Sequence, residues 1–216
     1  MILRVGAWSD WPWLEHGFGT RLSERWTHQP GRSWAQQVHG ATVVRVKREG
    51  PQGPADALIT TEPGLLLEIR TADCLPILIV DPVRRAIAAV HAGWRGTAAG
   101  VVVAAVERMQ AWCGSDPAEL KAAIGPSIGP CCFEVGPEVA AKFGRQGRTF
   151  LDLAQQNAQQ LRDTGVHQIT VLAGCTRCDA LRFHSHRRDR ERAGRMEAGI
   201  RLRPALGRPQ SAADTA

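Results

Sequence analysis

Long apolar segments are missing from this chain of 216 residues. No stretch approaches the ~18 uninterrupted apolar residues of a membrane-spanning helix, and the first residues contain no apolar run of signal-peptide length. These absences argue against a membrane partner and predict a soluble, cytoplasmic protein. With 44% hydrophobic residues, a chain of this length can bury roughly 70% of the surface that it exposes when unfolded, which is enough for a self-sufficient core.

Lysine is also scarce, because arginine supplies nearly all of the 27 basic side chains. Between Arg177 and Arg208 ten arginines face four acidic residues, so this segment is strongly basic. A nucleic-acid-binding module is the non-enzymatic alternative; it predicts salt-sensitive binding through this segment and no need for Cys74. Net charge indicates nonspecific attraction rather than a specific site, so a solvated basic face is favoured and nucleic acid is not an expected partner.

The six cysteines lack the setting of a disulfide framework, since no export signal accompanies them. Cys175 and Cys178 have the spacing of a metal-ligand pair, and Cys131 with Cys132 offers two further sulfurs. A second C-x-x-C pair is absent, however, and adjacent cysteines are awkward as a chelating pair. Packing and loop shape are therefore favoured over a structural zinc site.

Short strands and a few helices alternate along the chain. Apolar runs bounded by turn residues predict strands that are buried on both faces, at residues 65–70, 75–80 and 86–90, with a late strand at 169–172. Helices are predicted from Thr97, as N-cap, to Trp112, and over residues 137–143 and 150–164. The run 42–47 and the turn at 51–54 predict a hairpin-like crossing, and the Gly- and Pro-rich residues 125–132 predict a shaped loop.

Three soft-metal ligands, His39, Cys74 and His91, lie at the ends of apolar runs. Two imidazoles and one thiolate form the three-ligand set of a catalytic zinc ion, whose fourth position stays free for water or substrate. Separations of 35 and 17 residues are too long for the short ligand pairs of a zinc finger, so a site gathered from distant strand ends is predicted. His91 is expected at a strand-to-helix turn, beside a helix N-terminus that favours anions.

Several motifs occur in an order that is typical of one family. They are Gln37-Val38-His39-Gly40, Ala55-Asp56-Ala57-Leu58-Ile59-Thr60, Thr71-Ala72-Asp73-Cys74-Leu75-Pro76, His91-Ala92-Gly93-Trp94-Arg95-Gly96-Thr97, Ile124-Gly125-Pro126-Ser127-Ile128-Gly129 and Arg187-Arg188-Asp189. On these motifs the chain resembles the bacterial laccase-domain family. Its members are variously called multicopper polyphenol oxidoreductases, purine nucleoside phosphorylases or peptidoglycan-editing factors.

The resemblance implies an α+β (mixed α/β) fold in a single domain. Its layers would be α/β/β/α, similar to cytotoxic-necrotising-factor-like hydrolases, and the domain is predicted to span residues 1–203. Composition after Arg203 predicts a disordered tail over residues 204–216. We expect a monomer or a weak homo-oligomer.

The resemblance further implies that His39, Cys74 and His91 bind one zinc ion, with Cys74 and His91 taking part in catalysis. The implied reaction is phosphorolysis of the purine nucleosides adenosine, inosine and methylthioadenosine, with adenosine deamination as a second activity. A zinc ion lowers the pKa of bound water to near 7, which would supply the nucleophile for deamination. The Glu-containing signature of other zinc deaminases is absent, so no proton shuttle is identified.

Arg95, Arg187 and Arg188 are candidate phosphate ligands, because a guanidinium binds phosphate through two parallel hydrogen bonds. The expected partners are therefore a small-molecule nucleoside and phosphate. Two departures from the family pattern concern the substrate pocket. Residues 22–34 are abbreviated, and His184-Ser185-His186 stands where Phe-Ser-Tyr is common, with both histidines on one side if the segment is a strand.

Two other activities stay open at this point. Cys74 could act as a nucleophile paired with His91, in a hydrolase that removes misincorporated serine from peptidoglycan precursors. Copper-dependent phenol oxidation is the other, because a two-His, one-Cys site accepts copper, although multicopper chemistry needs more ligands than the motifs supply.

Overall fold

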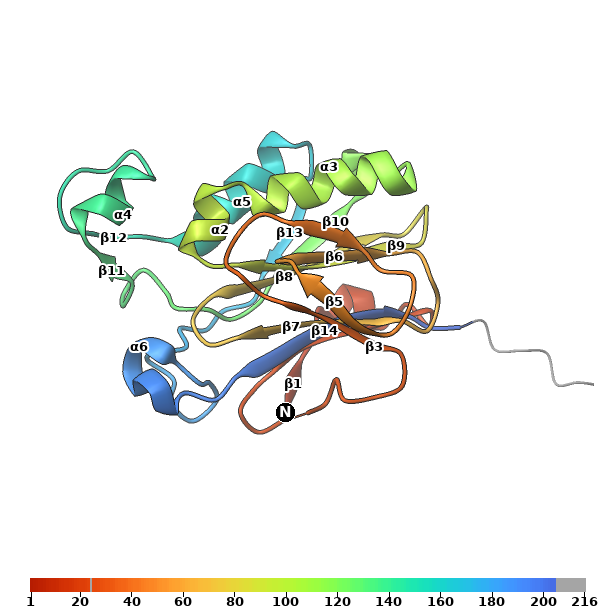
Figure 1. The fold of residues 1–216 in the computed structure, drawn as a ribbon, viewed down its shortest axis with the longest axis horizontal. Coiled ribbons are helices and arrows are strands. Elements are labelled where there is room, and N and C mark those ends of the chain that lie inside the picture. Colours follow the sequence, from red (N-terminus) through yellow and green to blue (C-terminus); the bar gives the residue numbers. More distant parts are fainter. Residues whose placement is uncertain (24, 205–216) are drawn as a thin grey trace, which may run out of the picture.

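Apolar side chains on both faces of two central strands decide the arrangement of the layers. Strands β8 (Leu75–Asp81) and β9 (Ala86–Ala92) are buried along their whole length. Successive strand side chains point to opposite faces, so Ile77 of β8 packs toward the helices while Leu78 packs toward a second sheet. The computed structural model describes residues 1–23 and 25–204, and two packed sheets with helices over one of them make up the fold (Figure 1).

Each large sheet contains six strands. Sheet A has the order β1 (Ile2–Leu3), β2 (Leu14–Gly19), β14 (Met196–Leu202), β7 (Leu66–Thr71), β3 (Arg32–Gln36) and β5 (Gly50–Pro54). Sheet B has the order β13 (Gln168–Val171), β10 (Lys121–Ile124), β8, β9, β6 (Ala57–Thr60) and β4 (Val43–Arg45). The pairs β3–β5, β3–β7, β4–β6 and β10–β13 are parallel, and the other neighbours are antiparallel. The strands β11 (Glu134–Val135) and β12 (Thr149–Phe150) form a small separate ribbon.

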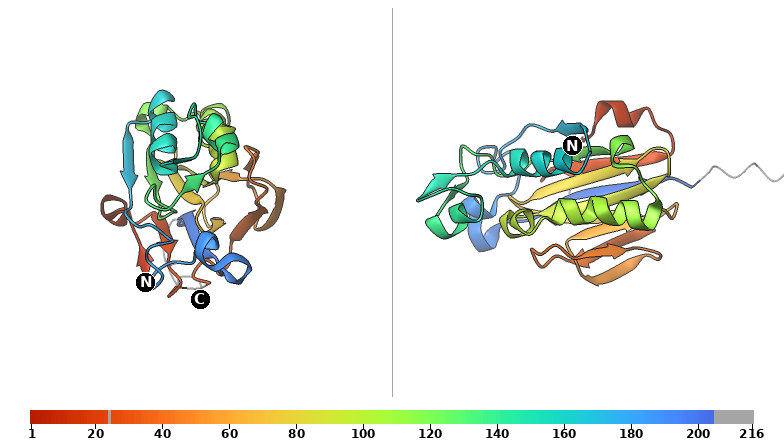
Figure 2. Two further views of the ribbon diagram at one scale, coloured as in Figure 1. Left: turned by 90° about the vertical axis from the view of Figure 1, so that its left-hand side faces the viewer. Right: turned by 90° about the horizontal axis from the view of Figure 1, so that it is seen from above.

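Two apolar cores hold these layers together. One lies between the sheets and includes Phe18, Leu67 and Ile200. The other lies between sheet B and the helices, where Val102 and Met109 are fully buried. The helices of this outer layer are α2 (Trp94–Ala98), α3 (Val101–Cys113) and α5 (Leu153–Asp163), and Figure 2 shows α3 and α5 side by side over the sheet.

The remaining described helices are short. They are α1 (Gly6–Ser9), α4 (Pro137–Ala141), α6 (His186–Asp189) and the 3₁₀ turns η1 (Pro117–Glu119) and η2 (Arg190–Arg192). The expected mixed α+β fold in a single domain is confirmed. The predicted domain end at residue 203 stays a prediction, and residues 205–216 of the predicted tail lie outside the described residues.

The helix predicted from Thr97 to Trp112 is divided in two. Gly100 has a left-handed backbone (φ 74°), which ends α2 and begins α3. Thr97 is therefore not an N-cap: it lies inside α2, and its hydroxyl accepts a hydrogen bond from Asn157 of α5 at 2.9 Å. The break joins α2 to the helical layer while leaving its first turn beside His91.

The hairpin-like crossing predicted for residues 42–54 is wrong. The predicted strand forms β4 in sheet B, whereas the predicted turn forms β5, which pairs with β3 at the edge of sheet A. Proline lacks an N–H group, but an edge strand tolerates it because one side of that strand needs no ladder hydrogen bonds. Likewise, residues 184–186 are not a strand, since Ser185 caps α6 and accepts a hydrogen bond from the Arg188 amide.

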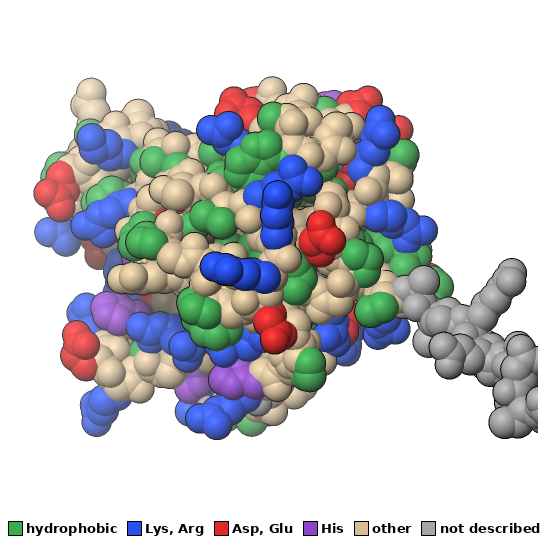
Figure 3. Space-filling view, turned by 45° about the vertical axis from the view of Figure 1, so that its right-hand side comes forward, with side chains coloured by type: hydrophobic (Ala, Val, Ile, Leu, Met, Phe, Trp, Pro, Cys, Tyr) green, Lys and Arg blue, Asp and Glu red, His purple; other side chains and the backbone are tan. Residues whose placement is uncertain are grey.

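Positive side chains do not gather in one place on the face drawn in Figure 3, where they lie from the helical layer to sheet A. In the basic carboxyl-terminal segment, Arg182, Arg188 and Arg201 pair with carboxylates. Of these pairs, Arg201 with Glu15 reduces the charge excess of the segment, because Asp179 and Asp189 already count among its four acidic residues. Within the described residues, no helix has the length and apolar character that crossing a membrane requires.

Candidate metal centre

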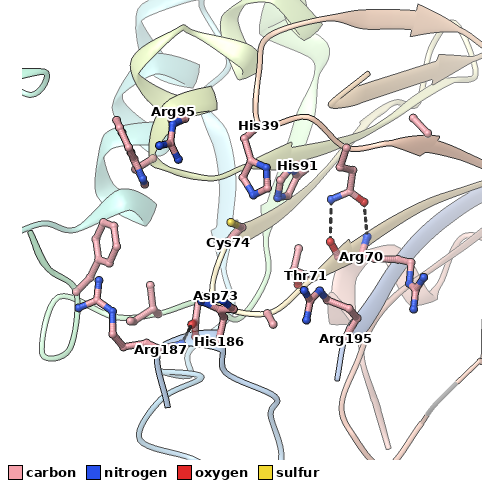
Figure 4. A pocket seen from close by; sticks show the side chains of 16 residues that line it. His39, Arg70, Thr71, Asp73, Cys74, His91, Arg95, His186, Arg187 and Arg195 are labelled. Carbon is pink, nitrogen blue, oxygen red and sulfur yellow. Dashed lines mark hydrogen bonds between the residues drawn. The ribbon is translucent and has the colours of Figure 1, made fainter. Parts of the chain in front are cut away.

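The three predicted ligands meet at one end of the sheet sandwich. His39 lies in the connection from β3 to β4, Cys74 lies between β7 and β8, and His91 lies near the end of β9. One ligand atom from each residue lies within 4.8 Å of the others, and the two imidazole rings meet edge to face with centroids 4.8 Å apart. The long sequence separations are thus closed by strand ends, as the motif positions predicted (Figure 4).

These ligands lie in a cavity of about 670 Å³. Its described lining combines the three ligands with cationic, polar and apolar side chains: Ala35, Gln37, His39, Arg70, Thr71, Ala72, Asp73, Cys74, His91, Trp94, Arg95, Ile128, Phe133, His186, Arg187 and Arg195. Pockets of roughly 300–1,000 Å³ are typical for small-molecule ligands. The cavity therefore has room for a nucleoside together with an anion.

Asp56, a buried carboxylate just before β6, organises two of the ligands. Its Oδ1 accepts hydrogen bonds from the His39 amide at 2.9 Å and from His91 Nδ1 at 2.8 Å, and its Oδ2 accepts from the Gly40 amide at 2.7 Å. His39 has a left-handed backbone (φ 60°), a conformation that costs a non-glycine residue about 1–3 kcal/mol and so needs such support. Asp56 thus fixes the His39 loop and the His91 ring together.

The same hydrogen bonds set the protonation of Asp56 and His91. Burial opposes ionisation of Asp56, but the bonds from His91 and Gly40 outweigh it and lower the pKa of the carboxyl group. An ionised Asp56 requires a proton on His91 Nδ1, which leaves Nε2 available as a ligand atom. A histidine that gives its other N–H to a carboxylate is the usual arrangement at metal centres.

Cys74 is poised to ionise. Burial opposes the thiolate, yet hydrogen bonds from His39 and His91, together with their charge, lower the pKa of Cys74 to about 7. Burial likewise opposes the charged form of His91, but its bonds to Asp56 and Cys74 raise the pKa of His91 to about 9. Binding of a soft or borderline cation would displace the proton on His91 Nε2 and leave the Cys74 thiolate between two neutral imidazoles.

Gly93 leaves the space that these ligands need. A Cβ atom built on Gly93 would lie 2.9 Å from Cys74 Sγ and 3.2 Å from His39 Cδ2. Its backbone (φ −77°, ψ 175°) is extended and open to any residue, so the requirement for glycine here is spatial. The glycine at the N-cap of α2 therefore keeps the ligands close to the first turn of that helix.

Asp73 connects segments of the cavity wall that lies opposite the histidines. Its Oδ1 accepts a hydrogen bond from the Thr176 hydroxyl, and its Oδ2 accepts one from the Arg187 amide, both at 2.6 Å. Its carbonyl oxygen accepts from the Ile128 amide at 2.9 Å. Both carboxylate oxygens therefore bind wall segments, so Asp73 positions the cavity rather than a ligand ring.

The structure brings two of the three predicted arginines to the cavity. Arg95 of α2 lies over the Trp94 ring, and Arg187 donates to the Glu134 carbonyl oxygen at 3.0 Å. Arg188 is not among the described lining residues. Its guanidinium pairs with Asp189 and donates to backbone carbonyl groups, including that of Phe183.

Three further lining residues bear on function. His186, at the start of α6, lines the cavity, whereas His184 does not. Arg70 and Arg195 also line it, and in Figure 4 they lie on the other side of Cys74 from Arg95. No spacing or motif in the sequence distinguishes Arg70 or Arg195 from the other arginines. Their positions follow from the pairing of β7 with β14, which begins one residue after Arg195.

Comparison with known proteins shows the family of this chain. The family described as multi-copper polyphenol oxidoreductase laccase matches residues 19–203. The chain belongs to that family. A relative named purine nucleoside phosphorylase from Deinococcus radiodurans is 43% identical over 177 residues, which cover 77% of this chain and 68% of the relative. The resemblance drawn from the motifs is thereby confirmed.

A second relative is known both as a sequence and as a structure. The purine nucleoside phosphorylase YlmD of Geobacillus stearothermophilus is 38% identical over 208 residues, which cover 83% of this chain and 76% of the relative. The crystal structure of YlmD superposes with a TM-score of 0.84 and 31% identity, covering 94% of this chain and 96% of that chain. The fold of this chain is therefore the fold of the family.

Proposed function

We propose that this protein is a zinc-dependent purine nucleoside phosphorylase that acts on adenosine, inosine or methylthioadenosine. The observation that carries the proposal is the convergence of the His39, Cys74 and His91 ligand atoms in a cavity that also contains Arg95 and Arg187. The relatives named purine nucleoside phosphorylase support the reaction class. A cytoplasmic location is part of the same proposal.

The ligand chemistry supports zinc. Two imidazole nitrogens and one thiolate are a common catalytic zinc set, and the Asp56–His91 pair supplies the supporting carboxylate. When bound, the ion would supply Lewis-acid chemistry by polarising an oxygen atom of the substrate. Copper also accepts this set. Oxidation by several copper ions would need several groups of metal ligands. Among the described residues, this cavity contains one such group, His39 with Cys74 and His91.

Phosphate and purine have complementary partners in the cavity lining. Arg95, near the start of α2, and Arg187, near the start of α6, present guanidinium groups suited to a phosphate dianion. Trp94 and Phe133 provide aromatic surface for a purine ring. We assign phosphate to Arg95 and Arg187, and we leave Arg188 out because its guanidinium is already bonded to Asp189 and to backbone oxygens.

In the proposed reaction a phosphate oxygen forms a bond to C1′ of the ribose while the bond from C1′ to N9 breaks. The bonding electrons leave with the purine, which takes up a proton, and the products are the free base and ribose 1-phosphate. The two guanidinium groups hold phosphate and stabilise its charge as it approaches the sugar.

A hydrolase that uses Cys74 directly is the second candidate, because Asp56, His91 and Cys74 form a chain of hydrogen bonds. In this alternative the thiolate attacks a carbonyl group, and His91 returns a proton to the leaving amine. Removal of serine from a peptidoglycan precursor is a reaction of this kind. Adenosine deamination stays part of the phosphorylase proposal as a side activity.

The test is incubation of the wild type, Cys74→Ala and Arg95→Ala with adenosine, with and without phosphate. Adenine, ribose 1-phosphate and inosine are quantified. We expect the wild type to form adenine and ribose 1-phosphate only with phosphate, and Cys74→Ala to form neither. Arg95→Ala should raise KM for phosphate roughly tenfold or more, because a charge-assisted hydrogen bond contributes about 1.5–3 kcal/mol.

Cys113→Ala is the matched control, since Cys113 is a half-buried thiol outside the cavity. Equal product from the wild type and Cys74→Ala would remove Cys74 from the chemistry. Serine release from a serine-containing precursor by chelator-treated protein, without nucleoside turnover, would favour the hydrolase instead. Zinc dependence is refuted if chelation and zinc readdition leave the phosphorolysis rate unchanged.

A further inference from the structure

Four cysteines form a second cluster, outside the cavity already described. Cys131 and Cys132 follow β10, and Cys175 and Cys178 follow β13. Because β10 and β13 pair in parallel, both loops leave the same edge of sheet B, and an isolated bridge joins Ser127 to Cys175. The four Sγ atoms all lie within 4.8 Å of one another.

The spacing of these sulfurs matches a metal ion rather than a disulfide. Cys131 Sγ lies 3.7 Å from the sulfurs of both Cys132 and Cys178, and Cys132 Sγ lies 3.3 Å from that of Cys178. A tetrahedral zinc ion with bonds of ~2.3 Å places its sulfur ligands ~3.8 Å apart. Sulfurs in a disulfide lie ~2.05 Å apart, and all four cysteines are free.

The adjacent pair, which the sequence disfavoured as a chelating pair, is accommodated by a tight turn. The Cys132 and Phe133 amides both donate to the Gly129 carbonyl oxygen, at 2.9 and 3.0 Å. This turn directs the side chains of Cys131 and Cys132 to the same side. Gly129 also approaches the cluster closely, since a Cβ atom there would lie 3.4 Å from Cys131 Sγ and 3.6 Å from Cys175 Sγ.

Hydrogen-bond donors surround the sulfurs. The Gly129 amide donates to Cys175 Sγ at 3.3 Å, and a second bond to the same sulfur comes from the Cys178 amide. Arg177 donates from its guanidinium to Cys132 Sγ at 3.5 Å. Four thiolates around a divalent ion carry a net charge of −2, which amide donors and a guanidinium stabilise.

We propose that Cys131, Cys132, Cys175 and Cys178 bind a structural zinc ion. Four thiolates in a tetrahedron are a closed set, so this ion would have no open position for substrate. Its place in the fold suggests what it stabilises. Ile128 and Phe133 on one loop line the cavity, and Thr176 on the other loop holds Asp73, so the ion would join the two loops that form the cavity wall.

The experiment measures zinc in protein expressed with zinc in the medium and then desalted. We expect two zinc ions per chain in the wild type and one in Cys178→Ser. Cys178 is chosen because its side chain is exposed, so the substitution should leave the protein folded. Cys74→Ser should keep the structural ion and lose the other. If the proposed catalytic ion is wrong, the wild type holds one ion and Cys178→Ser holds none, so the two proposals fail separately.

Spectroscopy tests the ligand set without relying on the Cys178 variant. Zinc X-ray absorption of the Cys74→Ser protein should report four sulfur neighbours at ~2.3 Å. Cobalt substitution of the same protein should give the intense visible and sulfur-to-cobalt charge-transfer bands of a four-thiolate site, unchanged in the control Cys113→Ser. The proposal is overturned if Cys178→Ser keeps the wild-type zinc content and cobalt spectrum, or if native thiol counting finds two of the four cysteines in a disulfide.

Discussion

Asp56 offers the sharpest test of how the first metal centre is built. The Asp56→Asn substitution keeps the size of the side chain but replaces one acceptor oxygen with an amide that donates. The oxygens of Asp56 face only donors: the amides of Val38, His39 and Gly40, and Nδ1 of His91. Whichever way the new amide turns, an N–H group will oppose another N–H group.

Two effects follow for the metal ligands. The His39 loop loses support for its left-handed backbone, and the His91 ring loses the charged partner that orients Nε2. Loss of such a supporting carboxylate typically weakens metal binding by about 10- to 100-fold. This range corresponds to about 1.4–2.7 kcal/mol of binding free energy.

The assay is a zinc titration of metal-free protein against a fluorescent competing chelator, in a Cys178→Ser background that leaves the four-cysteine cluster incomplete. Asp81→Asn is the matched control, because Asp81 is also fully buried and also accepts amide hydrogen bonds in a turn. It lies at the opposite end of β8 from Cys74. Unchanged zinc affinity in folded Asp56→Asn, or an equal loss in Asp81→Asn, would refute this account of the site.

Two further predictions concern Gly93 and His16. Gly93→Ala should weaken zinc binding in the same titration with little change in the free energy of unfolding, because its Cβ would crowd Cys74 Sγ and His39. The control is Gly136→Ala, at the N-cap of α4, where a Cβ would have nothing within 4 Å. Equal zinc affinities of the two variants would contradict the steric argument. Burial and the nearby charge of Arg4 lower the pKa of His16 to about 4, and Nε2 of His16 accepts a hydrogen bond from the Val5 amide. Since the ordinary value is 6.5, the neutral form stabilises the fold above pH 6.5, and this contribution fades as the pH falls toward 4. Between pH 7.5 and 5 the free energy of unfolding should fall by roughly 2 kcal/mol through His16. Urea unfolding should therefore be less sensitive to pH in His16→Gln, whose amide oxygen can accept the hydrogen bond from the Val5 amide. Equal pH dependence in the wild type and His16→Gln would rule out this role for His16.

The ligand trio could be predicted because each residue ends an apolar run, and strand ends meet at a sheet edge. The role of Asp56 is harder to predict, since it depends on hydrogen bonds to the backbone of a loop that lies 16 to 18 residues earlier in the chain. A signal was nevertheless present. A carboxylate inside the buried run Ala55-Asp56-Ala57 needs hydrogen-bond partners, and such groups often support functional sites.

Other features depend on contacts that sequence periodicity does not encode. Arg187 and Arg188 are adjacent, but α6 begins one residue earlier, and neighbouring helical side chains point in different directions. Only Arg187 therefore reaches the cavity. The residues of β5 predict a turn because proline and glycine usually mark turns, whereas the edge position of β5 in sheet A is decided by its pairing with β3.

The connections that carry His39 and Cys74 both pass from sheet A to sheet B, since β3 and β7 belong to one sheet and β4 and β8 to the other. His91 lies in sheet B. A cation held by all three would fasten the two halves of the sandwich to each other at that end. Its capture would depend on the sheets having docked, so metal uptake and completion of the tertiary structure would be one thermodynamic event.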